Sequence, residues 1–127
     1  MKYNFKQKYG LNVYDRQPED LFEYALSYGL HHIEIILSQE KLSIEAFTAD
    51  RINKLRDFTN SHKIQLSFHI PIHINISEIL TPLRKSNIKY LLRCIQTASE
   101  VNATHVILHV GRFYWFPVEQ WERKKAL

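Results

Sequence analysis

The sequence predicts an α/β protein in which parallel β-strands alternate with α-helices. Two observations carry this prediction. Short apolar segments typical of strands recur at roughly thirty-residue spacing, and segments with helical apolar periodicity lie between them. The resulting order, βαβαβαβ followed by the start of another helix, indicates a parallel sheet covered by helices with right-handed crossovers.

The first two strands enclose a short helix. The first strand is expected over residues 9–14. Asp15 to Gln17 can cap a helix that carries Pro18 in its first turn, since proline has no N–H to lose there. Gly29 suits the end of this helix because glycine readily adopts the left-handed conformation. The second strand follows over residues 32–37.

A longer helix and a third strand come next. The helix begins near Ile44 or Thr48 and ends at Ser61. Its inward-facing residues are Ile52, Leu55 and Phe58. The third strand is expected over residues 64–69, and Pro71 should end it by removing a hydrogen-bond donor.

The third helix is the clearest one in the sequence. After a loop over residues 72–80, Thr81 is predicted as its N-cap, with Pro82 at the first helical position. Its expected inward stripe comprises Ile88, Leu91, Leu92, Ile95 and Ala98. The fourth strand then spans residues 104–110 and ends at Gly111.

Two architectures accommodate this order: an open doubly wound sheet and the first half of an eight-stranded barrel. A nucleotide-binding open sheet normally has a glycine-rich loop after its first strand. Here that loop reads Asp15-Arg16-Gln17-Pro18, and the only three glycines are Gly10, Gly29 and Gly111. The prediction is therefore parallel βα repeats that form the N-terminal half of a (β/α)8 TIM barrel, as one truncated domain over residues 1–127.

Composition narrows the function only slightly. The chain is 45% hydrophobic and 24% charged, with a net charge of +4 that gives no specific indication of nucleic acid. No apolar run approaches the ~20 residues of a membrane span, and no signal sequence is visible, so a cytoplasmic protein is expected. Cys94, on a helical apolar pattern, is interpreted as a buried thiol.

Two histidines hold the most informative positions. His69 and His109 each lie at the C-terminal end of an apolar strand-like run. In a parallel sheet these ends share one face, where ligands and metals bind. Imidazole is a common zinc ligand, so the pair predicts half of a metal site. The alternative is that both histidines only cap their strands by hydrogen bonding.

Three segments resemble a known superfamily, the xylose-isomerase-like TIM barrels. His69-Ile70-Pro71-Ile72-His73-Ile74-Asn75-Ile76 is similar to the segment after its third strand, and Val106-Ile107-Leu108-His109-Val110-Gly111 to its fourth strand. Gly29-Leu30-His31-His32-Ile33-Glu34-Ile35 resembles its second strand. The group includes sugar phosphate isomerases and epimerases and endonuclease IV-type AP endonucleases. The resemblance covers roughly residues 9 to 112.

The resemblance implies a barrel with a divalent metal, zinc, manganese or magnesium, at its top. In the nuclease branch the histidines that match His69 and His109 bind zinc, whereas in many isomerases they line the substrate pocket. Val110 departs mildly from the usual proline. Ile72 stands where the nuclease branch has an aromatic residue that enters the DNA, and this departure weakens the nuclease interpretation.

Several other residues have two interpretations each. Glu34 either points into the barrel and contacts substrate or metal, or is a buried carboxylate paired with a lysine or arginine. Asn75 either binds substrate or ties the backbone of its loop. His31, His32 and His105 fall on the opposite face, where residues serve stability. The aromatic run Phe113-Tyr114-Trp115-Phe116 is either a stacking surface or apolar surface that further strands and helices cover.

The expected parent activity is a metal-dependent sugar or sugar-phosphate isomerase or epimerase, with its carboxylate bases on strands beyond this chain. The alternatives are a zinc-dependent abasic-site endonuclease and a non-catalytic half-barrel that needs a partner. A small sugar is the expected substrate, nucleic acid is less favoured, and no membrane is expected. Two imidazoles alone should bind metal weakly or not at all. Unpaired strand edges should cause self-association or pairing with a second half-barrel.

Overall fold

A four-stranded parallel sheet forms the centre of the molecule. The computed structural model describes residues 9–37 and 40–111. The strands are β1 (Gly10–Val13), β2 (His32–Ile36), β3 (Gln65–His69) and β4 (His105–Ile107). Every neighbouring pair is parallel, and the spatial order β1-β2-β3-β4 repeats the order in the sequence. This is the predicted strand arrangement, with β1 and β4 at the two edges.

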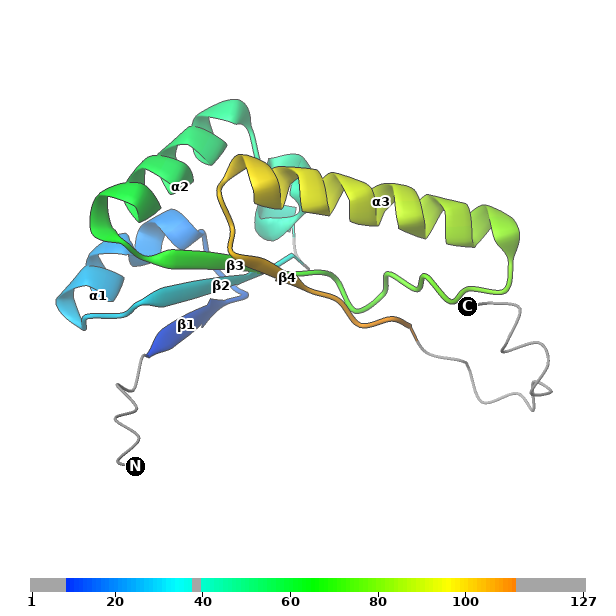
Figure 1. Cartoon of the computed structure of the whole chain (residues 1–127), viewed down its shortest axis with the longest axis horizontal. Helices are drawn as coiled ribbons and strands as arrows, with labels where there is room; N and C mark the ends of the chain where they lie inside the picture. Colours follow the sequence, from blue (N-terminus) through cyan, green and yellow to red (C-terminus); the bar gives the residue numbers. More distant parts are fainter. Residues whose placement is uncertain (1–8, 38–39, 112–127) are drawn as a thin grey trace, which may run out of the picture.

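The helices pack against the sheet from one side. They are α1 (Phe22–Ser27), α2 (Ala49–His62) and α3 (Thr81–Glu100), and three short 3-10 helices accompany them: η1 (Pro18–Leu21), η2 (Glu40–Leu42) and η3 (Ile44–Ala46). Figure 1 shows α2 and α3 above the sheet. Ala25 of α1, Leu55 of α2 and Cys94 of α3 are all fully buried in the same core. The opposite face of the sheet carries no helix among the described residues.

The strands alternate between two faces, which gives the sheet one apolar and one polar side. On β2, Ile33 and Ile35 are fully buried in the core, whereas His32 and Glu34 are half-buried. On β3, Leu66 and Phe68 belong to the core and His69 is half-buried. The short apolar segments expected as strands therefore each carry polar residues on one of their two faces. The helix-covered side is apolar, whereas the open side holds His32, Glu34 and His69 together with Ile36.

The ends of the first two helices differ in how they are capped. Gln17 precedes η1 without any side-chain cap bond, so the cap predicted over Asp15–Gln17 is not made through a side chain. Thr48 caps α2, because its hydroxyl accepts a hydrogen bond from the backbone N–H of Arg51 at 3.3 Å. Gly29 follows α1 with φ at +61°, the left-handed conformation that its position was expected to require.

The third helix corrects two predictions. Its N-cap is Leu80, which makes no side-chain cap bond, and Thr81 is already helical. Cys94 and Ala98 are buried as expected, but Ile88, Leu92 and Ile95 are 40%, 60% and 45% exposed. The predicted stripe was too wide because these three residues lie on a flank of α3 that no described element covers. Their apolar character still marks that flank as a surface suited to packing.

Two predicted features lie outside the described residues: the aromatic run Phe113–Phe116 and the helix start after Pro117. Within the described residues, no helix is both long and apolar enough to cross a membrane.

Candidate functional site

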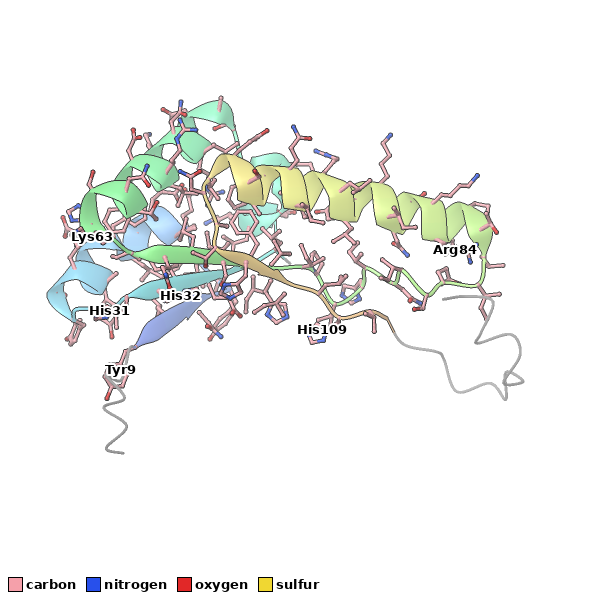
Figure 2. The ribbon with its side chains drawn as sticks, viewed as in Figure 1. Tyr9, His31, His32, Lys63, Arg84 and His109 are labelled. Atoms are coloured by element: carbon pink, nitrogen blue, oxygen red, sulfur yellow. The ribbon has the colours of Figure 1, made fainter. Side chains whose placement is uncertain are left out.

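The two strand-end histidines meet on the open face of the sheet. His69 is the last residue of β3, and His109 lies two residues beyond the end of β4. Their Nε2 atoms are 2.9 Å apart, and their ring centroids are separated by 5.0 Å. Figure 2 shows His109 on the side of the sheet away from α3. The predicted juxtaposition is therefore confirmed.

A carboxylate on the neighbouring strand supports this pair. Glu34 Oε1 lies 3.0 Å from Nδ1 of His69, and the two side chains are only 16% and 21% exposed. A carboxylate can only accept, so Nδ1 of His69 carries the hydrogen and donates it. In neutral His69 this leaves a lone pair on Nε2, which accepts a hydrogen bond from Nε2–H of His109. Glu34 thus pairs with a histidine, and not with the lysine or arginine considered from the sequence.

The strand register explains why these three residues meet. Glu34 is paired in register with Ser67, and His69 with Ile36 and Ile107. Each contact instead joins residues that are two positions out of register, Glu34 with His69 and His69 with His109. This regular offset is the stagger that tilted barrel strands require. It places the three side chains in one layer across β2, β3 and the end of β4.

The geometry suits two positions of a tetrahedral metal site. Zinc binds imidazole nitrogen at ~2.0–2.1 Å, so two such nitrogens in a tetrahedral site lie about 3.3 Å apart. The observed 2.9 Å between the Nε2 atoms is a hydrogen bond. To bind one ion, the two rings would separate slightly and turn so that their lone pairs converge, and His109 would carry its hydrogen on Nδ1 instead of Nε2. A carboxylate that accepts from the second ring nitrogen is the usual support of a metal-binding histidine. The described residues contain no group of three or more ligands of suitable type.

The loop after β3 is fastened to the end of β4 beside His109. Asn75 Oδ1 accepts a hydrogen bond from the backbone N–H of Ser77 at 3.1 Å. Ser77 Oγ donates to the carbonyl of Val110 at 3.1 Å, and Asn87 Nδ2 on α3 donates to the carbonyl of Asn75 at 2.9 Å. Asn75 therefore ties its loop, which is one of its two predicted roles. Its contact with a substrate stays a prediction.

Ser77 and Asn87 were not singled out from the sequence. The Asn75-Ile76-Ser77 spacing does contain a signal, because an asparagine side chain often accepts from the N–H two residues later. Asn87 carried no such signal, since its contact depends on how α3 lies over the loop.

A second polar group lies at the opposite ends of the strands. His32 Nε2 is 2.7 Å from Ser67 Oγ, and the His32 and His105 rings stack with centroids 5.3 Å apart. Burial, and then the neighbouring His105, lower the pKa of His32 below its ordinary value. His32 thus pairs with Ser67, and His105 pairs with Thr104 and stacks on His32; their role in stability stays a prediction.

Comparison with known proteins supports the same architecture. The sequence model of the family described as "Xylose isomerase-like TIM barrel" matches residues 22–127. No curated protein matches the chain. Among solved structures, a D-tagatose 3-epimerase-like protein has a TM-score of 0.74 at 16% identity. D-Psicose 3-epimerase from Clostridium cellulolyticum H10, solved with D-tagatose, has a TM-score of 0.75 at 13% identity. Endonuclease IV from Thermus thermophilus has a TM-score of 0.69 at 15% identity.

These structural matches establish the fold and its extent. Each covers 94% of this chain but only 44% of the matched chain, so the chain spans less than half the length of these structures. Four parallel strands alternating with helices thus correspond to part of a TIM barrel. At such low identity the matches show the fold alone, and they include both epimerases and an endonuclease.

Proposed function

The chain belongs to the xylose isomerase-like TIM barrel family, and we propose that it supplies the N-terminal part of a metal-dependent sugar or sugar-phosphate isomerase or epimerase. The observation that carries this proposal is the pair of Nε2 atoms 2.9 Å apart at the C-terminal strand ends. Ligands bind at this end of the strands in TIM barrels. The family is typically metal-dependent, and two strand-end imidazoles fit part of such a site.

In this proposal His69 and His109 are metal ligands and Glu34 holds His69 in the productive tautomer. A bound divalent ion would polarise the carbonyl of a sugar and so favour proton movement on the adjacent carbon. The remaining ligands and the carboxylate bases belong to strands that this chain does not contain. Glu34 and Asn75 are also our candidates for substrate contact, because Glu34 borders the histidine pair and Asn75 packs beside Gly111, two residues from His109.

The second candidate is a zinc-dependent abasic-site endonuclease. The observation that favours it is again the His69–His109 pair, since the resemblance assigns both histidines to zinc in the nuclease branch. Ile72 argues against it: the side chain is 62% exposed on the loop, but it is aliphatic and offers no aromatic ring to insert into DNA. A half-barrel that acts only together with a partner is a third candidate, supported by β1 and β4, which are the edge strands of the sheet over the described residues.

The deciding experiment assays the longest open reading frame that contains this chain. With Mn²⁺ or Zn²⁺ present, interconversion of a ketose with its C3 epimer or with an aldose is the expected activity. His69→Ala and His109→Ala should abolish it, whereas His62→Ala, at the end of α2 and outside the site, should leave it unchanged. Cleavage of abasic-site DNA without sugar turnover would establish the second candidate. A reading frame that ends at Leu127 and has neither activity would leave the partner-dependent half-barrel.

A further inference from the structure

The position of His109 depends on a contact that its own strand does not provide. β4 ends at Ile107, whose carbonyl accepts from Ile70 N–H at 2.9 Å, so the strand ladder stops two residues before His109. Beyond that point the chain is held by Ser77 Oγ, which donates to the Val110 carbonyl at 3.1 Å. Val110 directly follows His109. A hydroxyl on the loop after β3 therefore fixes the backbone that carries one member of the pair.

We propose that Asn75 and Ser77 are positioning residues that clamp the end of β4, and with it His109, against His69. The inference deepens the proposed function, on which its metal-binding part rests. Two features restrict the movement of Ser77: its side chain is buried, at 6% exposure, and its backbone N–H donates a hydrogen bond to Asn75 Oδ1 at 3.1 Å. Asn75 is in turn anchored to α3 by Asn87. A chain of hydrogen bonds through Asn87, Asn75 and Ser77 thus connects α3 to the end of β4 and limits how far that end can move.

Gly111 completes the clamp from the other side. Its φ is +118°, a conformation that residues with a side chain rarely adopt. A Cβ at this position would overlap Asn75 Oδ1 and would lie only 2.6 Å from Asn75 Cγ. Only glycine lets the end of β4 approach Asn75 this closely. The loop after β3 and the segment after β4 are therefore fitted to each other at the position next to the histidine pair.

The clamp has a role different from that of Glu34. Glu34 fixes the ring of His69 through its Nδ1 atom, whereas Asn75 and Ser77 act on the backbone that carries His109. Loss of the clamp should therefore leave the tautomer of His69 unchanged. It should separate the two Nε2 atoms and allow His109 to sample other positions.

The test uses Ser77→Ala and Gly111→Ala in the 127-residue chain, with Ser43→Ala as the matched control. Ser43 Oγ also donates to a backbone carbonyl at 3.1 Å, that of Glu40, but far from the pair. The first readout needs no metal: ¹⁵N spectra of the imidazoles report the Nε2–H···Nε2 hydrogen bond and the tautomer of each ring. The second is titration with zinc chloride alone. Thermal melts by circular dichroism show whether each variant is folded.

The expected result is loss of the His69–His109 hydrogen bond in Ser77→Ala and Gly111→Ala, with Nδ1 of His69 still protonated. Zinc should bind about tenfold more weakly in these variants than in the wild type or Ser43→Ala. If Gly111→Ala does not fold, Ser77→Ala decides alone. An unchanged hydrogen bond in folded Ser77→Ala, or its absence in the wild type, would overturn the clamp. Because two imidazoles are expected to bind zinc weakly, the hydrogen-bond readout decides the clamp. A wild type whose zinc affinity is no higher than that of His69→Ala would contradict the proposed metal site and leave the clamp intact.

Discussion

Replacement of Glu34 tests the link between the carboxylate and the metal-binding capacity of the pair. In Glu34→Gln the side chain keeps its shape and can still accept from Nδ1–H of His69, but it loses its charge. The lone pair on His69 Nε2 becomes less basic, so zinc should bind more weakly. In Glu34→Leu the acceptor is lost as well, and the ring is free to place its hydrogen on Nε2, where it blocks metal binding.

The size of the effect follows from the contact. A hydrogen bond to a charged group contributes about 1.5–3 kcal/mol. The Glu34 and His69 side chains are 16% and 21% exposed, so solvent screens the 3.0 Å contact in part and the lower end applies. Glu34→Gln keeps a neutral hydrogen bond and loses only part of this free energy. Since about 1.4 kcal/mol is a factor of ten in affinity, Glu34→Gln should weaken zinc binding by up to about tenfold. Glu34→Leu should weaken it by up to about a hundredfold, the upper range for such supporting residues.

Isothermal titration with zinc chloride measures these differences. Glu45→Gln is the control, because Glu45 also makes a 3.0 Å contact, with Arg93, but on the exposed surface. Its zinc affinity should equal that of the wild type, which itself is expected to bind weakly with only two imidazoles. Equal affinities for the wild type and Glu34→Leu would refute the reasoning. Tight stoichiometric binding by the wild type would show that the chain contributes ligands beyond His69 and His109.

Four further predictions concern the rest of the molecule. Burial raises the pKa of the Cys94 thiol to about 11, so a thiol reagent at about pH 8 should label it only as fast as the protein opens. Because the pKa of His32 is lowered, unfolded His32 binds a proton that the folded residue excludes. The free energy of unfolding should therefore fall as pH drops below about 6.5, and His32→Gln should flatten this dependence in urea titrations at several pH values. Arg51 is buried, and its guanidinium donates to Glu19 at 2.7 and 3.2 Å. Arg51→Met should therefore lower the free energy of unfolding, measured in urea, by about 2–4 kcal/mol. A decrease of less than about 0.5 kcal/mol, which is ordinary for a surface site, would argue against this. The chain should self-associate through its open edges at micromolar concentration, and a stable monomer by size-exclusion chromatography with light scattering would contradict this.

Strand positions and the histidine pair were accessible from the sequence because they depend on local pattern and topology. His69 and His109 each end an apolar run, and parallel strands have their C-terminal ends at the same edge of a sheet. These two facts were enough to predict that the two histidines lie close together. The observed strands are nevertheless shorter than predicted, most of all β4, which covers His105–Ile107 instead of residues 104–110. The segment beyond Ile107 departs from the ladder because the loop after β3, through Ser77, holds it instead of a strand.

The details that could not be predicted from the sequence depend on contacts between distant segments. The partner of Glu34 is set by the two-residue stagger between strands, which no local pattern contains. Thr81 has the residue type of a cap, but the helix begins one residue earlier than that role requires, with Leu80 as its N-cap. Ile88, Leu92 and Ile95 keep helical spacing with one another, at four and three residues, yet burial follows only where another element lies against the helix.

The polar character of the open face changes what holds this part of a barrel to its remainder. The interior of a TIM barrel is usually filled by bulky branched residues. Here the corresponding face presents His32, Glu34, Ser67 and His69, which already satisfy one another or their neighbours by hydrogen bonds. Ile36 and Ile107, which are paired in register with His69, share this face and remain as its apolar part. Within the described residues, the edge strands β1 and β4 and the exposed apolar flank of α3 are the further surfaces suited to association. The polar groups of the open face are then available for chemistry, because assembly can rely on these other surfaces.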